Sequence, residues 1–206
     1  MYRLGALLIG YLLGGVQSAI LYGRLKGIDI RTKGSGNAGT TNAVRVLGKK
    51  AGAIVLLIDV LKAIVAICIS RLLFGGNHSN QMILISLYSG IGAILGHSYP
   101  LFFGFKGGKG IATTVGILLG IDHRIFVVSG LLFLISFAIT RIVSISSLIL
   151  TTSIPILIIL LYARVGTVGV EAMFLAFFIT AFTFYRHRAN IKRLMDGTES
   201  KLTSKK

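Results

Sequence analysis

The stretch Gly104-Phe-Lys-Gly-Gly-Lys-Gly110 separates two hydrophobic segments. Its four glycines and two lysines predict a loop whose backbone N–H groups can approach an anion. The residues that follow, Ile111-Ala-Thr-Thr-Val-Gly-Ile-Leu-Leu, predict a helix whose positive dipole end meets that loop. The stretch is not a Walker A motif, because the glycine spacing and the Ser or Thr after Gly-Lys are missing. It indicates a phosphate-binding loop, with a lysine-containing cytoplasmic turn as the alternative.

The composition around this loop is that of a membrane protein. Hydrophobic residues make up 54% of the 206 residues, although the formal charge is +16. Apolar residues recur in blocks of about 20, the length of a membrane-spanning helix. A single cysteine, Cys68, and four scattered histidines predict neither a disulfide nor a metal site, and we expect no cofactor. Cytoplasmic loops rich in Lys and Arg, which also attract anionic lipids or substrates, explain the basic charge. We therefore expect no nucleic acid partner.

Seven apolar blocks follow one another along the chain. They cover residues 4–23, 51–74, 82–103, 111–121, 124–140, 142–163 and 171–185. The first is not followed by a small-residue cleavage pattern, so it is interpreted as a span and not as a signal peptide. The fourth has 11 residues, which form about 16 Å of helix against a bilayer core of about 30 Å, so it is either a short span or a re-entrant segment. No linker divides the chain, and we predict a single domain over residues 1–206.

Lysine and arginine decide between these two interpretations of the fourth block. The loop 24–50 and the tail from residue 186 each carry seven Lys or Arg, so both are expected in the cytoplasm. Six blocks lie between them, and six crossings return the chain to the same side whereas five do not. We therefore predict an all-α protein with seven transmembrane helices, a short fourth helix, the N-terminus outside and the C-terminus cytoplasmic. Lys106, Lys109 and Arg141 then also face the cytoplasm, together with 14 of the other basic residues.

A first polar cluster, Thr32-Lys-Gly-Ser-Gly-Asn-Ala-Gly-Thr-Thr-Asn42, lies in the basic loop and is followed by Arg45. No acidic residue occurs between Arg31 and Lys50. A helix that begins near Thr40 places Asn42 and Arg45 on one face, and the arginine fork suits a phosphate. The alternative is a turn in which Ser or Asn caps a helix.

A second cluster, Gly96-His-Ser-Tyr-Pro100, leads into the glycine-rich loop. Pro100 is expected to end or kink the third span and to free carbonyl groups near the membrane interface. His97 is either a helix-end histidine that a carbonyl satisfies or a residue with a chemical role.

A third cluster, Arg186-His-Arg-Ala-Asn-Ile-Lys-Arg193, follows the last span, with Gly197 and Glu199 beyond it. His187 and Asn190 are three residues apart and therefore neighbours on a helix. A basic helix beside the membrane is often only a lipid anchor, but His and Asn between the arginines are not explained by that role.

Acidic residues are scarce, with only six in the chain and none in the first two clusters. The clusters therefore suit anions and not cations. Asp59 and Lys62 lie within the second span, three residues apart. We expect them to pair and face the helix bundle, in preference to forming a proton or ion relay.

These residues resemble the bacterial membrane glycerol-3-phosphate acyltransferases that use acyl phosphate as donor, the PlsY family. The resemblance covers nearly the whole chain and rests on three motifs in order. They are Ser35-Gly-Asn-Ala-Gly-Thr-Thr-Asn42 with Arg45 and Gly48, Gly96-His-Ser-Tyr-Pro-Leu-Phe-Phe-Gly-Phe-Lys-Gly-Gly-Lys-Gly110, and Arg186-His-Arg-Ala-Asn-Ile-Lys-Arg-Leu-Met-Asp-Gly-Thr-Glu199. Thr40 departs from the family, which usually has alanine there.

The resemblance implies transfer of an acyl chain from acyl phosphate to the 1-hydroxyl of glycerol 3-phosphate, which gives lysophosphatidic acid and phosphate for phospholipid synthesis. A set of four residues is implied to be catalytic: Ser35, Arg45, His187 and Asn190. The implied substrate-binding residues are Asn37, Thr41, Asn42, Lys106, Gly107, Gly108, Lys109 and Gly110, and the implied supporting residues are Asp59, Lys62, His97 and Glu199.

Within these sets, each substrate has its own residues. Arg45, Lys106, His187 and Asn190 are assigned to glycerol 3-phosphate. Ser35, its neighbouring amides and the glycines of 107–110 are assigned to acyl phosphate. Either His187 or a substrate phosphate oxygen takes the hydroxyl proton, and the sequence leaves this choice open.

The resemblance also implies a location and partners. We expect a multi-pass protein of the bacterial plasma (inner) membrane, in contact with membrane lipids, with its active site at the cytoplasmic face. A soluble enzyme that forms acyl phosphate is a candidate for handing over this substrate. A transporter for an organic phosphate, with the fourth helix as its broken helix, is the alternative function, but no internal repeat relates the two halves of the chain. A membrane scaffold without catalytic activity leaves the spacing of the three clusters unexplained.

Overall fold

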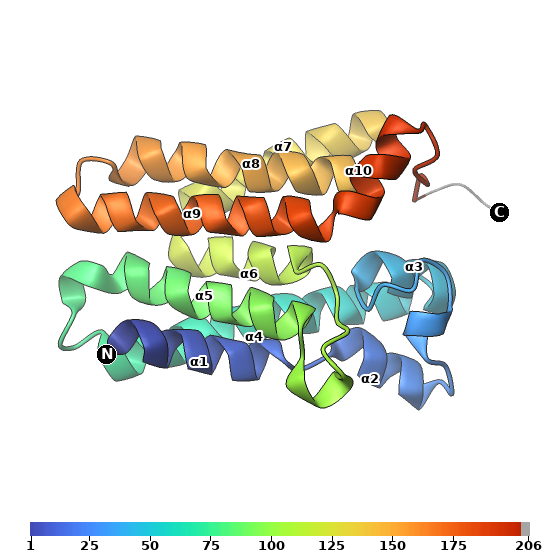
Figure 1. Cartoon of the computed structure of the whole chain (residues 1–206), viewed down its shortest axis with the longest axis horizontal. Coiled ribbons are helices and arrows are strands. Elements are labelled where there is room, and N and C mark those ends of the chain that lie inside the picture. Colours follow the sequence, from blue (N-terminus) through green and yellow to red (C-terminus); the bar gives the residue numbers. More distant parts are fainter. Residues whose placement is uncertain (203–206) are drawn as a thin grey trace. The chain divides into compact units, whose positions relative to one another are not determined.

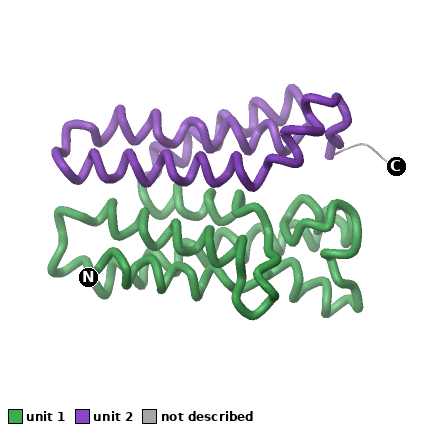
Figure 2. The backbone as a smooth tube through the Cα atoms, viewed as in Figure 1, with its two compact units in different colours: residues 1–121 green, residues 122–206 purple. Residues whose placement is uncertain are grey.

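The computed structural model describes residues 1–202, and all regular secondary structure in this range is helical (Figure 1). The helices form two compact units (Figure 2). Unit 1 is Met1–Ile121, and unit 2 begins at Asp122 and contains the rest of the described chain. The all-α prediction is confirmed for this range, and the single domain stays a prediction.

Unit 1 contains six α-helices and unit 2 contains four, counted over the described residues. In unit 1 they are α1 (Tyr2–Gly14), α2 (Ser18–Leu25), α3 (Thr40–Leu47), α4 (Lys49–Phe74), α5 (Met82–Ser98) and α6 (Ile111–Ile121), with 3-10 turns at Ile30–Thr32, Ser79–Gln81 and Leu101–Phe103. In unit 2 they are α7 (His123–Thr140), α8 (Val143–Tyr162), α9 (Gly166–Arg186) and α10 (Arg188–Met195).

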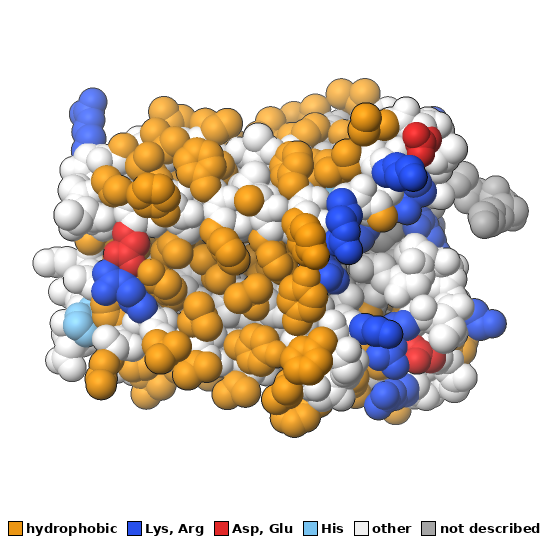
Figure 3. Space-filling model, in the orientation of Figure 1, with side chains coloured by type: hydrophobic (Ala, Val, Ile, Leu, Met, Phe, Trp, Pro, Cys, Tyr) orange, Lys and Arg blue, Asp and Glu red, His pale blue; other side chains and the backbone are white. Residues whose placement is uncertain are grey.

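Six helical segments within residues 1–202 are long and apolar enough to cross a membrane. They are Tyr2–Leu25, Lys49–Phe74, Ser79–Phe103, His123–Thr140, Val143–Tyr162 and Gly166–Arg186, with Ile111–Ile121 as a shorter apolar helix. Each of the seven blocks expected from the sequence coincides with one of these helices. In each unit, hydrophobic side chains cover the middle of the visible face, and Lys and Arg gather toward the ends (Figure 3).

Close backbone contact joins α1 to α5 in unit 1, where the two helices run side by side (Figure 1). A Cβ on Gly10 or Gly14 of α1 would collide with backbone carbonyls of α5, and a Cβ on Gly92 or Gly96 of α5 would collide with backbone carbonyls of α1. Both pairs have the spacing Gly-x-x-x-Gly, which lets helix backbones approach closely in membranes. This contact places the C-terminal end of α5, with the second cluster, against the end of α1.

The first span is broken, which the sequence did not indicate, since it predicted one span over residues 4–23. Helix α1 ends at Gly14 and α2 begins at Ser18. The break turns the carbonyl of Val16 toward α4, where the Lys62 ammonium donates to it at 2.7 Å. Gln17, buried in the break, donates from its side chain to the carbonyl of His97 at 3.1 Å. The break therefore supplies polar partners inside the helical bundle.

Hydroxyl contacts link the helices of unit 2. Ser129 and Ser153 lie 2.7 Å apart between α7 and α8, and Thr180 of α9 donates to the carbonyl of Thr151 at 2.8 Å. At the start of α7, Asp122 accepts from the Arg124 amide at 2.8 Å and from the Tyr162 hydroxyl at 2.8 Å. The Arg124 side chain and these other donors hold the pKa of Asp122 well below its ordinary value, despite partial burial.

Candidate functional site

The first loop, residues 33–39, is held in place by the side chain of Asn42. Its Oδ1 accepts from the Ser35 amide at 2.9 Å, and its Nδ2 donates to the carbonyls of Ile30 and Lys33, both at 3.0 Å. Asn42 is buried, on the first turn of α3. In this structure the amide of Asn42, predicted to bind substrate, orders the loop that presents Ser35.

Helix α3 begins at Thr40 as predicted, so Asn42 and Arg45 lie one turn apart, with Asn42 buried and Arg45 exposed. Its N-cap is Gly39, and no side chain caps it. The alternative of a Ser or Asn helix cap is therefore wrong. Ser35 is exposed, whereas Asn37 and Thr41 are half-buried. The first loop thus presents an exposed serine ahead of an uncapped helix start, and α3 presents an exposed arginine in its last turn.

The glycine-rich loop, residues 104–110, folds back onto the end of α5. Pro100 ends the helix as expected, and the carbonyls that it frees are used by the loop, because Gly107 N donates to Ser98 O at 3.2 Å and Gly108 N to His97 O at 3.1 Å. The expectation that the amides of Gly107 and Gly108 are bare is therefore wrong. Their lack of a Cβ serves close packing, since a Cβ on either would collide with His97.

The remaining part of the glycine-rich loop keeps the features of an anion site. Lys106 is exposed, Lys109 is half-buried, and Gly110 has a positive φ of 86° immediately before α6 begins at Ile111. A left-handed backbone of this kind favours glycine. The helix start, Gly110 and the two lysines therefore remain the anion-binding candidates of this loop.

The first loop and the glycine-rich loop contact each other within unit 1. A Cβ on Gly108 would lie 2.7 Å from the carbonyl oxygen of Ala38. A second contact joins the residues just before the two loops, because Arg31 Nη1 donates to Phe103 O at 3.2 Å while Asp29 accepts from the Nε and Nη2 of Arg31. This hydrogen bonding lowers the pKa of Asp29 to about 2. The structure therefore brings the first and second clusters together.

Asp59 and Lys62 form the expected pair inside unit 1, with Lys62 Nζ 2.8 Å from Asp59 Oδ1. Both side chains are buried. His97 joins them, because its Nδ1 lies 2.8 Å from Lys62 Nζ. One alternative from the sequence is a helix-end histidine that is satisfied by a carbonyl group. The partner of His97 Nδ1 is instead the ammonium group of Lys62.

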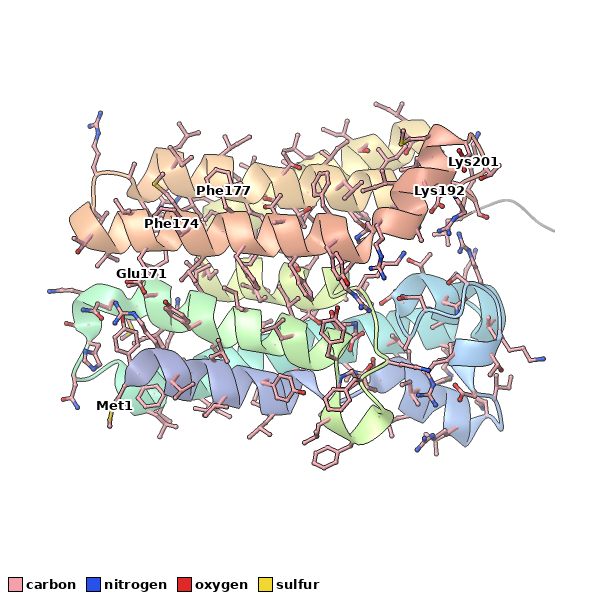
Figure 4. The ribbon with its side chains drawn as sticks, in the orientation of Figure 1. Met1, Glu171, Phe174, Phe177, Lys192 and Lys201 are labelled. Atoms are coloured by element: carbon pink, nitrogen blue, oxygen red, sulfur yellow. The ribbon has the colours of Figure 1, made fainter. Side chains whose placement is uncertain are left out.

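The third cluster belongs to unit 2. His187 lies between α9 and α10, is 2% exposed, and its Nδ1 lies 2.9 Å from the carbonyl oxygen of Thr183. A carbonyl can only accept, so Nδ1 carries a hydrogen and Nε2 is the acceptor nitrogen of the neutral ring. This contact therefore fixes the neutral ring in one tautomer. His187 follows the end of α9, and Figure 4 shows Phe174 and Phe177 along that helix, with Lys192 and Lys201 beyond its end.

Glu199 organises the third cluster from the chain beyond α10. Its Oε1 accepts from Asn190 Nδ2 at 2.6 Å and from Ser144 Oγ at 2.9 Å, and its Oε2 accepts from Arg193 Nε at 2.6 Å. Burial raises the pKa of Glu199, but the three donors outweigh burial, so the pKa lies below its ordinary value. These contacts fit the supporting role expected for Glu199, which stays a prediction.

Several contacts were not indicated by the sequence. They are made by Gln17, by Ser18, whose Oγ donates to Asp59 Oδ1 at 2.8 Å, and by Asp29, Ala38 and Ser144. Ser144 is on α8, 55 residues from Glu199, and no periodicity relates two such positions. Asp29 offers a local signal, since an Asp two residues before an Arg can cap the turn that follows. Within the described residues, no group of three or more His, Cys, Asp or Glu could hold a metal ion.

Comparison with known proteins gives consistent matches over almost the full length. The family described as glycerol-3-phosphate acyltransferase matches residues 4–197. The glycerol-3-phosphate acyltransferase of Clostridioides difficile is 40% identical over 200 residues, which cover 96% of this chain and 94% of that protein. That of Enterococcus faecalis is 43% identical over 202 residues, with 96% and 90% covered.

Two solved structures are similar to this chain. One is a crystal structure of PlsY, an integral membrane glycerol 3-phosphate acyltransferase, in its glycerol 3-phosphate form. It has a TM-score of 0.84 and 36% identity, and the match covers 98% of this chain and 96% of that one. The other is PlsY in its lysophosphatidic acid form, with a TM-score of 0.81, 35% identity, and 98% and 95% covered.

Proposed function

This chain belongs to the glycerol-3-phosphate acyltransferase family, and on that premise we propose that acyl phosphate is its acyl donor. The products are then lysophosphatidic acid and inorganic phosphate. Both substrates carry a phosphate, and the acyl chain of the donor can remain in the bilayer. Glycerol-3-phosphate acyltransfer supplies phospholipid synthesis.

One observation carries this proposal: two loops rich in hydrogen-bond donors and free of acidic residues contact each other in unit 1. The carbonyl of Ala38 in the first loop lies 2.7 Å from the Cβ position of Gly108. Asp29 and Asp59, the two acidic residues of unit 1, are paired with Arg31 and Lys62. A surface with donors and no competing carboxylate suits phosphate groups and not a cation.

The reaction joins the 1-hydroxyl oxygen of glycerol 3-phosphate to the acyl carbonyl carbon. The hydroxyl proton passes to a base, a tetrahedral intermediate forms, and the carbon–oxygen bond to phosphate breaks with release of the phosphate anion. Phosphate is a fair leaving group, so the site contributes chiefly by positioning the substrates and by donating to the developing oxyanion.

Roles are proposed for the residues on this basis. Arg45 and Lys106 bind the phosphate of glycerol 3-phosphate, and the exposed Ser35 with the start of α6 binds that of the donor. Asn190 binds glycerol 3-phosphate, and Glu199 orients the side chain of Asn190. His187 is the proposed base, because its Nδ1 contact to the Thr183 carbonyl makes Nε2 the acceptor nitrogen.

The proposal includes a membrane topology. Seven spans, with α6 as the short fourth, place the N-terminus outside and the loops at 24–50, 104–110 and the tail in the cytoplasm. The site then faces the cytoplasm at the inner membrane, where a soluble enzyme that forms acyl phosphate can hand over its product.

The test is transfer by the purified protein with radiolabelled glycerol 3-phosphate. Acyl phosphate should support lysophosphatidic acid formation, and acyl-CoA at the same concentration should not. Transfer from acyl-CoA alone would leave the family assignment intact and remove the proposed donor. Uptake of the label into proteoliposomes without any acylated product would favour a phosphate transporter.

A further inference from the structure

Asp59, Lys62 and His97 form a buried polar cluster in unit 1, and the residue roles proposed for the reaction do not include them. They are 0%, 7% and 3% exposed. Asp59 and Lys62 lie on α4, and His97 lies in the last turn of α5. Charged side chains inside membrane helices are costly and are usually retained for a functional reason.

Lys62 lies at the centre of the cluster. Its Nζ is 2.8 Å from Asp59 Oδ1, 2.7 Å from Val16 O and 2.8 Å from His97 Nδ1. Asp59 Oδ1 also accepts from Ser18 Oγ at 2.8 Å. An ammonium group has three N–H donors and no acceptor, so these three contacts use all of them. His97 Nδ1 must then accept, and the neutral ring carries its hydrogen on Nε2.

The Nε2 side of His97 faces the glycine-rich loop. A Cβ on Gly108 would collide with Nε2, and the same point lies 2.7 Å from Ala38 O of the first loop. The backbone of His97 holds the loop as well, because its carbonyl accepts from Gly108 N at 3.1 Å. His97 therefore contacts Gly108 through both its ring and its main chain.

We propose that Asp59 and Lys62 are positioning residues that fix the tautomer and ring orientation of His97, and that His97 in turn holds the glycine-rich loop against the first loop. None of the three touches a substrate. The geometry of the two loops would then depend on a charge pair that lies deeper in the helical bundle. The proposal rests on the proposed function only for its activity readout, since the tautomer is measured independently.

The first test measures the tautomer of His97 in purified protein by nitrogen-15 NMR, with its signals identified by their absence in His97→Asn. Wild-type protein should show hydrogen on Nε2 and an acceptor Nδ1. The double variant Asp59→Asn with Lys62→Met removes both charges together and leaves no unpaired buried charge. It should lose the single tautomer. Hydrogen on Nδ1 in the wild type, or an unchanged spectrum in the double variant, would overturn the proposal.

The second test compares two replacements of the same histidine. In His97→Gln the side-chain amide can reach the position of Nε2 and donate toward the loop, whereas in His97→Asn it reaches only the position of Nδ1 and can accept from Lys62. If His97 positions the loop, kcat/KM of His97→Gln should exceed that of His97→Asn by about tenfold or more. His97→Asn should nevertheless have the higher Tm, because it satisfies Lys62.

A purely structural histidine predicts the opposite order of activity, with His97→Asn better in both kcat/KM and Tm, and that result would overturn the proposal. Equal activities would overturn it as well. Absence of acyl transfer in the wild-type protein would count against the proposed function and leave the NMR result to decide on the positioning role.

Discussion

The side-chain amide of Asn190 donates to the carboxylate of Glu199 at 2.6 Å, although the two residues lie on different sides of the turn that ends α10. A carboxylate with three donors fixes the Asn190 side chain in one orientation. Asn190 can then present its carbonyl oxygen in a constant direction.

Glu199→Gln should lower kcat/KM for glycerol 3-phosphate by about tenfold, because the amide cannot accept from Asn190 and Arg193 as a carboxylate does. Steady-state kinetics of the purified variant measure the change. Asp196→Asn is the matched control, since it removes a nearby exposed negative charge outside this network. Equal effects of the two substitutions would show that only the charge matters.

The low pKa of Glu199 has a consequence for stability. Its folded pKa lies below the ordinary value of 4.5, so its contribution is complete above that value and is lost as the pH falls through the folded pKa. The difference in Tm between wild type and Glu199→Gln should stay constant near neutral pH and shrink under acidic conditions. A difference that grows on acidification would contradict the assigned direction.

Arg45→Lys should raise KM for glycerol 3-phosphate, because lysine cannot form the two-point contact of the guanidinium fork. The expected loss is about 1.5–3 kcal/mol, or roughly ten- to a hundredfold. Arg164→Lys, at an exposed position between α8 and α9, is the control and should be unaffected. Unchanged KM and kcat in Arg45→Lys would remove this residue from the site.

The topology can be tested by labelling single cysteines with a reagent that does not cross the membrane, in a background that lacks Cys68. Exposed positions 77 and 167 should react from outside, and exposed positions 33, 106 and 192 should react only after the membrane is opened. Labelling of position 106 from outside would contradict the seven-span topology.

Gly108→Ala should lower both activity and Tm, because the added methyl group collides with the His97 ring. A change at Gly108 therefore affects both the candidate site and the packing of the glycine-rich loop on α5. Gly130→Ala is the matched control, since no atom lies within 4 Å of its Cβ position in α7. It should keep full activity and gain up to about 1 kcal/mol of stability from helix propensity. A normal Tm in Gly108→Ala would show that the loop moves away without cost.

Most helices could be predicted from the sequence, because the length of an apolar block indicates a membrane-spanning helix. Pro100 likewise indicates, from local sequence alone, where α5 ends. The start of α3 near Thr40, the start of α6 at Ile111 and the Asp59–Lys62 pair also follow from spacing alone. The break at residues 15–17 could not be predicted, since its polar groups are satisfied by Lys62 and His97, which lie far along the chain.

The candidate site was predicted less completely, because residue type indicates which groups can bind a phosphate but not which are already used. The side-chain amide of Asn42 is hydrogen-bonded to the first loop, and the backbone amides of Gly107 and Gly108 donate to the carbonyls that Pro100 frees. These hydrogen bonds depend on contacts between different segments, and such contacts leave no periodic pattern in a single sequence.

Transfer of an acyl group from acyl phosphate to glycerol 3-phosphate is the reaction proposed for this chain. Its most direct test uses a donor with oxygen-18 in the bridge between the acyl carbon and phosphorus, followed by mass spectrometry of the products. Acyl transfer predicts that the label appears in inorganic phosphate and that lysophosphatidic acid is unlabelled. Label in a free fatty acid together with a phosphorylated glycerol 3-phosphate would show phosphoryl transfer instead and would contradict the claim.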